Sequence, residues 1–433
     1  MSKKNIFVIG FNEFNKIELN TIKGAENYNF IPLLTEEQIK SEEKPNLQNS
    51  LNKARTILNN FKSPIDGLIT FFDFPFTLIT FKLIEEYDLD GPSLKSGIKC
   101  EHKYWSRLLQ QKIIPENIPG FEAVDPFKQN DLESIKLSPP FWLKPVKSYG
   151  AQLGFKINEQ KDLDAALNKL RQNINYFADP FNYILSFIDL PEEINHIDGN
   201  YCIAEELIGG HQCTLSGYVY NHEAHTYGVV DSVNYPGTHS FFYYLLPSEL
   251  PEDIQKRMAE IGKKVMEYIG FNNSTFNIEF YYNEEKDEIK LLEINPRMSQ
   301  SHSDLYAKVT GHSNHQVLVN LAQGKNPDFK YENGPFKYGA KIHHRVFHDG
   351  IVKHFPDEKE LEKIKKEYPH THLIPQVKTG DRLSDIPGQD SYSFRDVIIY
   401  TGANSKKELM NKYQDILDKM DIQIEKVNNH EIH

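Results

Sequence analysis

Three oxygen-bearing side chains of the stretch "FNIEFYYNEEKDEIKLLEINPR" (residues 276–297) could hold a metal ion. The pattern predicts two strands joined by a charged turn, with Glu279 on the first strand and Glu293 and Asn295 on the second. Because side chains alternate along a strand, Glu293 and Asn295 share a face, and antiparallel pairing can bring Glu279 beside them. Two carboxylates and an amide oxygen are ligands that suit Mg²⁺ carrying substrate phosphates.

The alternative for this hairpin is that Glu279 and Glu293 are ordinary charges on an edge strand that faces solvent. The segment "NPR" that ends the hairpin speaks against this alternative, because Arg297 adds a guanidinium beside the amide and the second carboxylate. Such groups are costly to desolvate unless a metal ion, a polyphosphate or a salt bridge compensates them.

A second candidate phosphate contact lies in "FWLKPVKSYGAQLG" (residues 141–154). Lys144 ends an apolar strand and precedes a turn that contains two glycines, Gly150 and Gly154. A lysine in this place can touch phosphate oxygens while backbone N–H groups of the turn close over them. A surface lysine near a turn is an equally good interpretation of Lys144 alone.

A third segment, "AEELIGGHQCT" (residues 204–214), suits a connector that binds adenine. Main-chain groups of such a connector meet the edge of the base, and polar side chains meet the base and the ribose. The alternative is that Glu205 and Glu206 are solvated acids before a turn, with Gln212 just past the Gly-Gly pair.

The elements that must position these residues follow one another in an alternating and then mixed order, so we expect an α/β and α+β multidomain protein. We expect one helix over about residues 99–112 and another that ends at Gly270. The predicted divisions are an N-terminal α/β domain at 1–115, a segment at 116–203, a core at 204–330 that holds the metal site, and a C-terminal α+β segment at 331–433.

Composition excludes several classes of function. The net charge of −12 and the pI near 5.8 argue against a nucleic-acid-binding protein. No apolar run approaches the roughly 20 residues that span a bilayer, so no membrane partner is expected. The first residues show no signal-peptide core, and three cysteines make neither a disulfide framework nor metal-ligand spacing. These features indicate the reducing cytoplasm.

The order of four motifs resembles the ATP-grasp superfamily over roughly residues 1–330. The motifs are "HKYWSRLLQQKIIPENIPG", "FWLKPVKSYGAQLGF", "AEELIGGHQCT", and "FNIEF" through "LLEINPR". The resemblance implies an ATP-grasp fold with a Rossmann-like N-terminal domain, a mobile lid subdomain at 116–203 and a closing C-terminal subdomain. That last subdomain is similar to those of the carboxylase-like and amino-acid-ligase branches.

The resemblance also implies a role for each motif in binding ATP. Lys103 matches the first nucleotide-binding lysine, and Lys144 matches the second, which reaches the α- and β-phosphates from the lid. The lid loop matches Ser148 to Gly154, in which Ser148, Tyr149 and Gly150 cover the γ-phosphate. Gln212 stands where the family usually has a ribose-binding glutamate. The hinge that contacts adenine matches Glu205, Glu206, Leu207 and Ile208.

The metal and phosphoryl roles fall on the hairpin and the residues after it. Glu279, Glu293 and Asn295 match the Mg²⁺ ligands, for two ions, and Arg297 matches the residue that steadies the transferred phosphoryl group. The tail "RMSQSHSD" lacks the glutamate that biotin carboxylases have before the histidine, which lowers a bicarbonate interpretation. Candidates for contacting the acceptor are Ser301, His302 and Ser303, whose alternative role is to cap the following helix.

The leading hypothesis is therefore an ATP-dependent ligase that activates a carboxylate as an acyl phosphate and joins it to an amine, with amino acids as expected substrates. The alternatives are a bicarbonate-dependent carboxylase-type enzyme and a regulatory module that binds ATP without chemistry. Both substrates of the ligase reaction are expected to be small molecules. The resemblance also implies a homodimer, because proteins of this family commonly form one. The acceptor pocket is assembled from loops, so fold analogy does not specify the substrate.

Overall fold

The computed structural model describes residues 2–40, 46–128, 131–150, 152–238, 240–330, 333–386, 389 and 393–427. The chain forms two compact units, each assembled from several segments. The first unit comprises Met1–Tyr227, Leu250–Gln300 and His315–Phe329, and the second comprises Gly228–Glu249, Ser301–Asn314 and Lys330–His433. The division into four consecutive segments stays a prediction.

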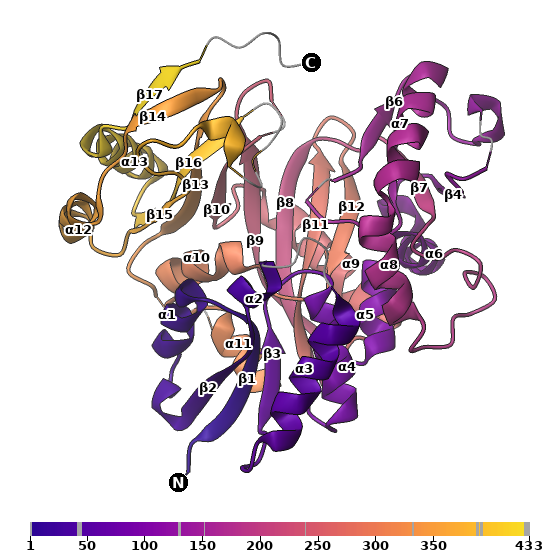
Figure 1. Ribbon diagram of the computed structural model, residues 1–433, viewed down its shortest axis with the longest axis horizontal. Helices are drawn as coiled ribbons and strands as arrows, with labels where there is room; N and C mark the ends of the chain where they lie inside the picture. Colours follow the sequence, from indigo (N-terminus) through magenta and orange to yellow (C-terminus); the bar gives the residue numbers. More distant parts are fainter. Residues whose placement is uncertain are drawn as a thin grey trace. The chain divides into compact units, whose positions relative to one another are not determined.

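The first unit begins with a parallel three-stranded sheet in the order β2-β1-β3 (Figure 1). The middle strand is fully buried from Ile6 to Ile9, as expected for a parallel strand that is covered on both faces. This arrangement confirms the Rossmann-like N-terminal unit. Its elements are β1 (Lys4–Phe11), α1 (Glu13–Thr21), β2 (Tyr28–Thr35), α2 (Glu36–Lys40), α3 (Leu47–Asn60), β3 (Gly67–Thr70) and α4 (Phe76–Glu86).

An antiparallel four-stranded sheet follows in the order β4-β7-β5-β6. The apolar stripe of its first helix, Leu163, Leu167 and Leu170, packs on Phe141 and Leu143 of the sheet. Each buried leucine contributes about 1.5–3 kcal/mol through removal of apolar surface from water. The elements are β4 (Phe121–Val124), β5 (Phe141–Pro145), β6 (Phe155–Ile157), α7 (Gln160–Asn173), α8 (Asn175–Leu185) and β7 (Cys202–Glu206).

The prediction of one helix over residues 99–112 was wrong. The segment forms α5 (Leu94–Glu101) and α6 (Lys103–Ile113), which are separated by His102 in an extended conformation. Nδ1 of His102 accepts from the N–H of Trp105 and so caps α6, while Nε2 lies 2.8 Å from the carbonyl oxygen of Ile197. These two contacts, one of them 95 residues away in sequence, stabilise the break between the helices.

The third part of the first unit is a group of antiparallel strands, β8 (His211–Tyr220), β11 (Ser274–Asn283) and β12 (Glu288–Asn295). The helix α9 (Glu252–Ile269) packs on β8. Acidic residues in the first turn of α9 favour its start, and Gly270 ends it at φ 76°, as predicted. The short helix α11 (His315–Leu321) completes this unit.

The second unit contains a five-strand run in the order β9-β10-β13-β16-β15 (Figure 1). One face of this run, including Ala340 and Ile342, packs against apolar residues of its helices such as Leu361, Leu409 and Ile416. The elements are β9 (Glu223–Asn234), which begins in the first unit, β10 (Phe241–Leu246), α10 (Gln300–Thr310), β13 (Tyr338–Val346), β14 (Gly350–His354), α12 (Glu358–Glu367), β15 (His372–Pro375), β16 (Phe394–Ala403), α13 (Lys406–Met420) and β17 (Gln423–Lys426).

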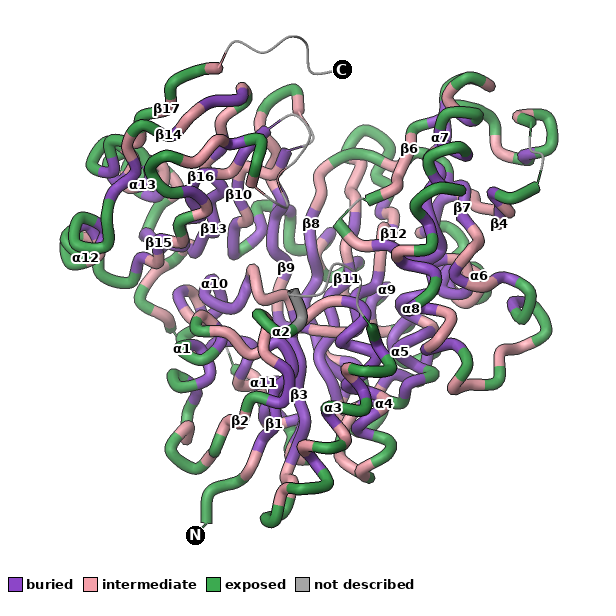
Figure 2. The backbone as a smooth tube through the Cα atoms, viewed as in Figure 1, coloured by how far each residue is buried: buried purple, intermediate pink, exposed green. Residues whose placement is uncertain are grey.

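The helices in both units bury one face and expose the other, which the alternating purple and green of Figure 2 makes visible. In the part of the chain that the structure describes, no helix is both long enough and apolar enough to cross a membrane.

A buried ion network joins the elements of the first unit that carry the predicted site. Nε of Arg107 on α6 lies 2.6 Å from Oε1 of Glu205 on β7, and one of its terminal nitrogens donates to the carbonyl oxygen of Leu292 on β12. The other carboxylate oxygen of Glu205 lies 2.6 Å from Nζ of Lys144 on β5. Burial raises the pKa of Glu205, but Arg107 and Lys144 outweigh that effect and lower the pKa to about 2.

The substitution Glu205→Gln should lower the free energy of unfolding at pH 7 by about 3–5 kcal/mol, because it leaves two buried cations without their carboxylate. A carboxyl with a folded pKa near 2 and an ordinary pKa of 4.5 contributes about 3 kcal/mol above pH 4.5 and loses it as the pH falls toward 2. The difference between the two proteins should therefore shrink between pH 7 and pH 3.5 in urea unfolding.

The matched control is Glu206→Gln, which changes the neighbouring residue. The carboxylate of Glu206 is exposed and accepts from the N–H of Gly120 at 2.7 Å. Its loss should cost less than about 1 kcal/mol. Equal stability of the two variants would show that the Glu205 network does not hold these elements together.

Candidate active site

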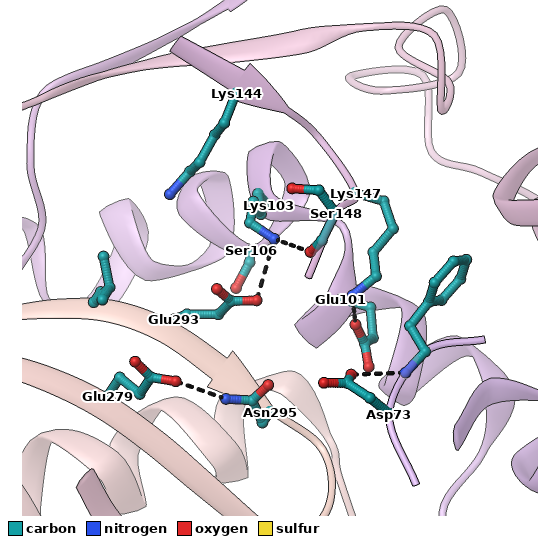
Figure 3. A network of polar contacts seen from close by, with 12 residues as sticks. Asp73, Glu101, Lys103, Ser106, Lys144, Lys147, Ser148, Glu279, Glu293 and Asn295 are labelled. Carbon is teal, nitrogen blue, oxygen red and sulfur yellow. Dashed lines mark hydrogen bonds and ion pairs between the residues drawn. The ribbon is translucent and has the colours of Figure 1, made fainter. Parts of the chain in front are cut away.

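The hairpin of β11 and β12 brings the predicted metal ligands together. Glu279 pairs directly with Glu293, and Asn277 pairs directly with Asn295, in the antiparallel register of the two strands. The amide nitrogen of Asn295 donates to Oδ1 of Asn277 at 3.1 Å and to Oε1 of Glu279 at 3.4 Å. Figure 3 shows the two carboxylates and the amide of Asn295 on the same side of the hairpin. The structure therefore brings these three side chains together, and their role as metal ligands stays a prediction.

The two carboxylates differ in their electrostatic surroundings. Burial and the nearby charge of Glu293 raise the pKa of Glu279 to about 7. Burial also acts to raise the pKa of Glu293, but Lys103, Lys147 and Lys144 outweigh it and lower that pKa. The first carboxylate therefore lacks sufficient positive charge near it, and a divalent cation fits the place.

Lys103 connects this hairpin to the predicted lid loop. It is the first residue of α6 and is 8% exposed. Its Nζ donates to Oε1 of Glu293 at 3.1 Å and to the carbonyl oxygen of Ser148 at 2.9 Å, as Figure 3 shows. Burial lowers the pKa of Lys103, and Lys147 and Lys144 add to this effect, while Glu293 opposes it. An anionic ligand beside these lysines would relieve their mutual repulsion.

Lys144 is the second predicted lysine, and β5 places it on the same site. It is 9% exposed, and its only ion pair among the described residues is the one to Glu205. Figure 3 shows Lys144 and Lys103 on the side of the hairpin that carries Glu293. The structure therefore brings both predicted lysines to the predicted metal ligands, although their roles with a nucleotide stay a proposal.

Sequence reasoning missed a second charged cluster that borders the first. Lys147, which is 1% exposed, forms an ion pair with Glu101 at the end of α5 and lies 4.8 Å from the centre of the Phe74 ring. Burial acts to lower the pKa of Lys147, but the carboxylates of Glu101, Asp73 and Glu293 outweigh it and raise that pKa. Each member comes from a different segment, so no spacing in the sequence reveals the cluster.

Arg297 joins the two clusters. A terminal nitrogen of its guanidinium lies 2.5 Å from Oδ2 of Asp73 and 3.5 Å from Oδ1 of Asn295. The backbone carbonyl of Arg297 accepts from the amide of Asn277, which fixes the chain after β12. Nε of Arg297 is buried and has no hydrogen-bond partner among the residues that the structure describes. One N–H of a buried guanidinium thus remains for an oxyanion.

The predicted lid loop is described except for Ala151, which lies outside the described residues. Ser148 contributes its carbonyl to Lys103, and Gly150 has φ 60°, where a side chain would be strained. A Cβ on Gly154 would lie 2.7 Å from the indole of Trp142, so the glycine permits this close approach. Burial and a hydrogen bond with a neighbouring tyrosine raise the pKa of Tyr149.

The predicted adenine connector follows β7. Glu205 is buried within the ion network, whereas Glu206 and Leu207 are exposed and Ile208 is half-buried. Gln212, the predicted ribose contact, donates to Oε2 of Glu279 at 3.3 Å and accepts from the hydroxyl of Tyr281 at 3.1 Å. Its amide is therefore bonded to a predicted metal ligand.

The predicted acceptor residues belong to the second unit. Ser301, His302 and Ser303 lie in the first turn of α10, which begins at Gln300. Oγ of Ser301 accepts from Nζ of Lys341 at 2.7 Å, and His302 and Ser303 are buried. Their role toward an acceptor substrate stays a prediction.

Comparison with known proteins gives a domain match for part of the chain and a fold for the whole chain. Residues 137–303, which include Lys144, Glu205, Glu279, Glu293 and Arg297, match the family model of the ATP-grasp domain.

Three solved structures resemble the whole chain. The L-amino acid ligase from Bacillus licheniformis is 19% identical, with a TM-score of 0.73, over 99% of this chain and 100% of that one. N5-carboxyaminoimidazole synthase from Aspergillus clavatus, in complex with ADP and 5-aminoimidazole ribonucleotide, is 14% identical, with a TM-score of 0.63, over 97% and 99%.

The biotin carboxylase domain dimer of Hydrogenobacter thermophilus 2-oxoglutarate carboxylase, in complex with MgADP, ADP and bicarbonate, is 14% identical. Its TM-score is 0.61, over 99% of this chain and 92% of that chain. At these identities the similarity establishes the fold. Residues 137–303 therefore match the ATP-grasp domain, and the chain has the ATP-grasp fold over its length.

Proposed function

We propose that this protein is an ATP-dependent ligase that activates a carboxylate as an acyl phosphate and joins it to an amine, releasing ADP and phosphate. The observation that carries the proposal is the convergence of Glu279, Glu293 and Asn295 with Lys103 and a buried guanidinium N–H. A site that only binds a nucleotide has less need of these phosphoryl-transfer groups. The likeness to an L-amino acid ligase supports amino acids as substrates.

Each group of residues has a separate role in phosphoryl transfer. Lys103 and Lys144 bind phosphate oxygens of ATP, and their burial strengthens each contact because water does not screen it. The lid loop that begins at Ser148 closes over the γ-phosphate and excludes water, which otherwise hydrolyses an acyl phosphate.

Glu279, Glu293 and Asn295 would hold Mg²⁺, for two ions. When bound, Mg²⁺ neutralises charge that develops on the transferred phosphoryl group. Arg297 is held by Asp73 and directs its free Nε–H to the oxygens of that group. The carboxylate substrate takes the phosphoryl group, and the amine then displaces phosphate to form the amide.

The likeness to a biotin carboxylase with bound bicarbonate supports a second candidate, a bicarbonate-dependent carboxylase-type reaction. An ADP-release screen that crosses carboxylic acids with amines separates the two. The ligase predicts ADP release that requires both a carboxylate and an amine, and a hydroxamate when hydroxylamine replaces the amine. ADP release that bicarbonate alone stimulates would favour the second candidate.

The first prediction concerns Lys103. Lys103→Met should lower the rate of ADP release by about 100-fold or more, because it removes a buried cation that contacts the transferred phosphate region. The control is Lys112→Met on the same helix, where the lysine is exposed and lies 3.3 Å from Glu193. Lys112→Met should retain the rate of the unmodified protein, and equal rates for both variants would remove Lys103 from the site.

The second prediction concerns metal affinity and pH. Because the pKa of Glu279 lies near 7, the carboxyl is protonated at pH 6 and must lose its proton to hold a cation. The affinity for Mn²⁺, used as a spectroscopic substitute for Mg²⁺, should rise about fivefold between pH 6 and pH 7 and about tenfold by pH 8, where it levels off. Titration of free Mn²⁺ by electron paramagnetic resonance measures this.

The matched variant for the metal titration is Glu279→Gln, which removes the titrating group. It should bind Mn²⁺ more weakly and without the rise between pH 6 and pH 7. An affinity of the unmodified protein that stays constant over this range would contradict the assignment of Glu279 as a ligand.

A further inference from the structure

A row of basic side chains lies on one face of β13 in the second unit. Lys341, His343 and Arg345 alternate along this strand, so they share a face. The ring of Tyr244 confirms this for the first two, since it lies 5.8 Å from Nζ of Lys341 and 5.6 Å from the His343 ring. Arg395 stands directly opposite Arg345 on the neighbouring strand β16. The other face of β13 packs in the apolar core, so this row is the polar face of the sheet.

Lys341 is a buried lysine that has no carboxylate partner among the described residues. It is 9% exposed, and no carboxylate among the described residues lies within ion-pair distance of its Nζ. Its contacts are the hydroxyl of Ser301 at 2.7 Å and the rings of Tyr244 and Tyr400. Burial lowers the pKa of Lys341 to about 7, and Arg395 adds to this effect. A hydroxyl and two aromatic faces offset only part of the cost of burying an ammonium group.

His343, next in the row, is buried with both ring nitrogens unsatisfied. It is 4% exposed, and neither Nδ1 nor Nε2 has a hydrogen-bond partner among the residues that the structure describes. Burial lowers its pKa, and the charges of Lys341, Arg395 and Arg345 lower it further. A neutral imidazole retains one N–H that can donate to an oxyanion. Unsatisfied donors of this kind are rare in protein interiors and call for a partner.

A buried lysine without an acid and a buried imidazole without hydrogen-bond partners both cost stability, and among the described residues Lys341 and His343 are such groups. We infer that the face of β13 is an anion-binding site whose ligand is a compact oxyanion, a carboxylate or a phosphate group, bound by Lys341 and His343. The small exposed fraction of the row limits the ligand to a compact group at this point. The site adjoins Ser301, one of the predicted acceptor contacts, so the inference rests on the proposed function and names where an anionic group of a substrate would bind. Its test needs no nucleotide, so it can fail while the proposed function holds.

The test is anion binding by the full-length protein in the absence of nucleotide, measured as the thermal unfolding midpoint against anion concentration. Sodium phosphate and sodium succinate are compared with sodium chloride at equal ionic strength. We expect at least one oxyanion to raise the midpoint saturably where chloride does not. Saturation by phosphate alone assigns a phosphate ligand, and saturation by succinate alone or by both assigns a carboxylate-accepting site. Identical curves for all three salts would overturn the inference.

Two variants connect the response to this site. Lys341→Met should weaken the oxyanion affinity at least tenfold while raising the midpoint of the ligand-free protein, because it removes an uncompensated buried charge. His343→Gln should weaken the affinity to a smaller extent. The control, Lys353→Met on β14, changes an exposed lysine that lies 2.6 Å from Glu425, and should leave the affinity unchanged. An equal affinity for Lys341→Met and the unmodified protein would also overturn the inference.

Discussion

The compensation of buried charge by a partner on a different segment is the constraint on which the first unit depends. Glu293 on β12 would be costly to bury alone, yet Lys103 on α6 lies 3.1 Å from it. The buried carboxylate of Glu205 on β7 is likewise compensated by ion pairs with Arg107 and Lys144. Each pair joins two elements, so the positions of helix and strands are fixed by the same charges that form the site.

The described residues around Glu279 and Arg297 do not fully compensate these two groups, and this indicates which ligands the site would bind. Glu279 has an amide beside each carboxylate oxygen but no lysine or arginine within ion-pair distance among the described residues, and its pKa rises accordingly. Arg297 has a carboxylate partner in Asp73, but its Nε has no hydrogen-bond partner within the described part of the chain. An acid on β11 that needs a cation, and a cation just after β12 that retains a donor, are the complementary requirements of a metal and its phosphate.

The shared face of Glu293 and Asn295 could be predicted from the sequence because alternation along a strand fixes which side chains lie on one side, and antiparallel pairing allows Glu279 to lie beside them. The register itself could not be predicted, because it shifts next to Glu279. Lys103 and Lys144 were found through the order of four motifs. Lys147 and its partner Glu101 were not, because an ion pair between a strand end and a helix end leaves no periodic signal.

Asp73 escaped prediction for the same reason, since 224 residues separate it from Arg297. The break between the helices at His102 was not predicted, because its cause is a contact with Ile197, far along the chain. Local hydrophobic periodicity does not report such a contact. The sequence thus predicts those parts of the site that lie within one hairpin, while the parts that depend on long-range packing require the structure.

The central claim is that Glu279, Glu293 and Asn295 hold the metal that binds the phosphates of ATP. A crystal structure of the protein with Mg²⁺ and a non-hydrolysable ATP analogue tests it most directly. The account predicts Mg²⁺ at about 2.0–2.1 Å from oxygens of these three side chains and in contact with the phosphates. Mg²⁺ and phosphates bound elsewhere, with these oxygens outside the coordination shell, would contradict it.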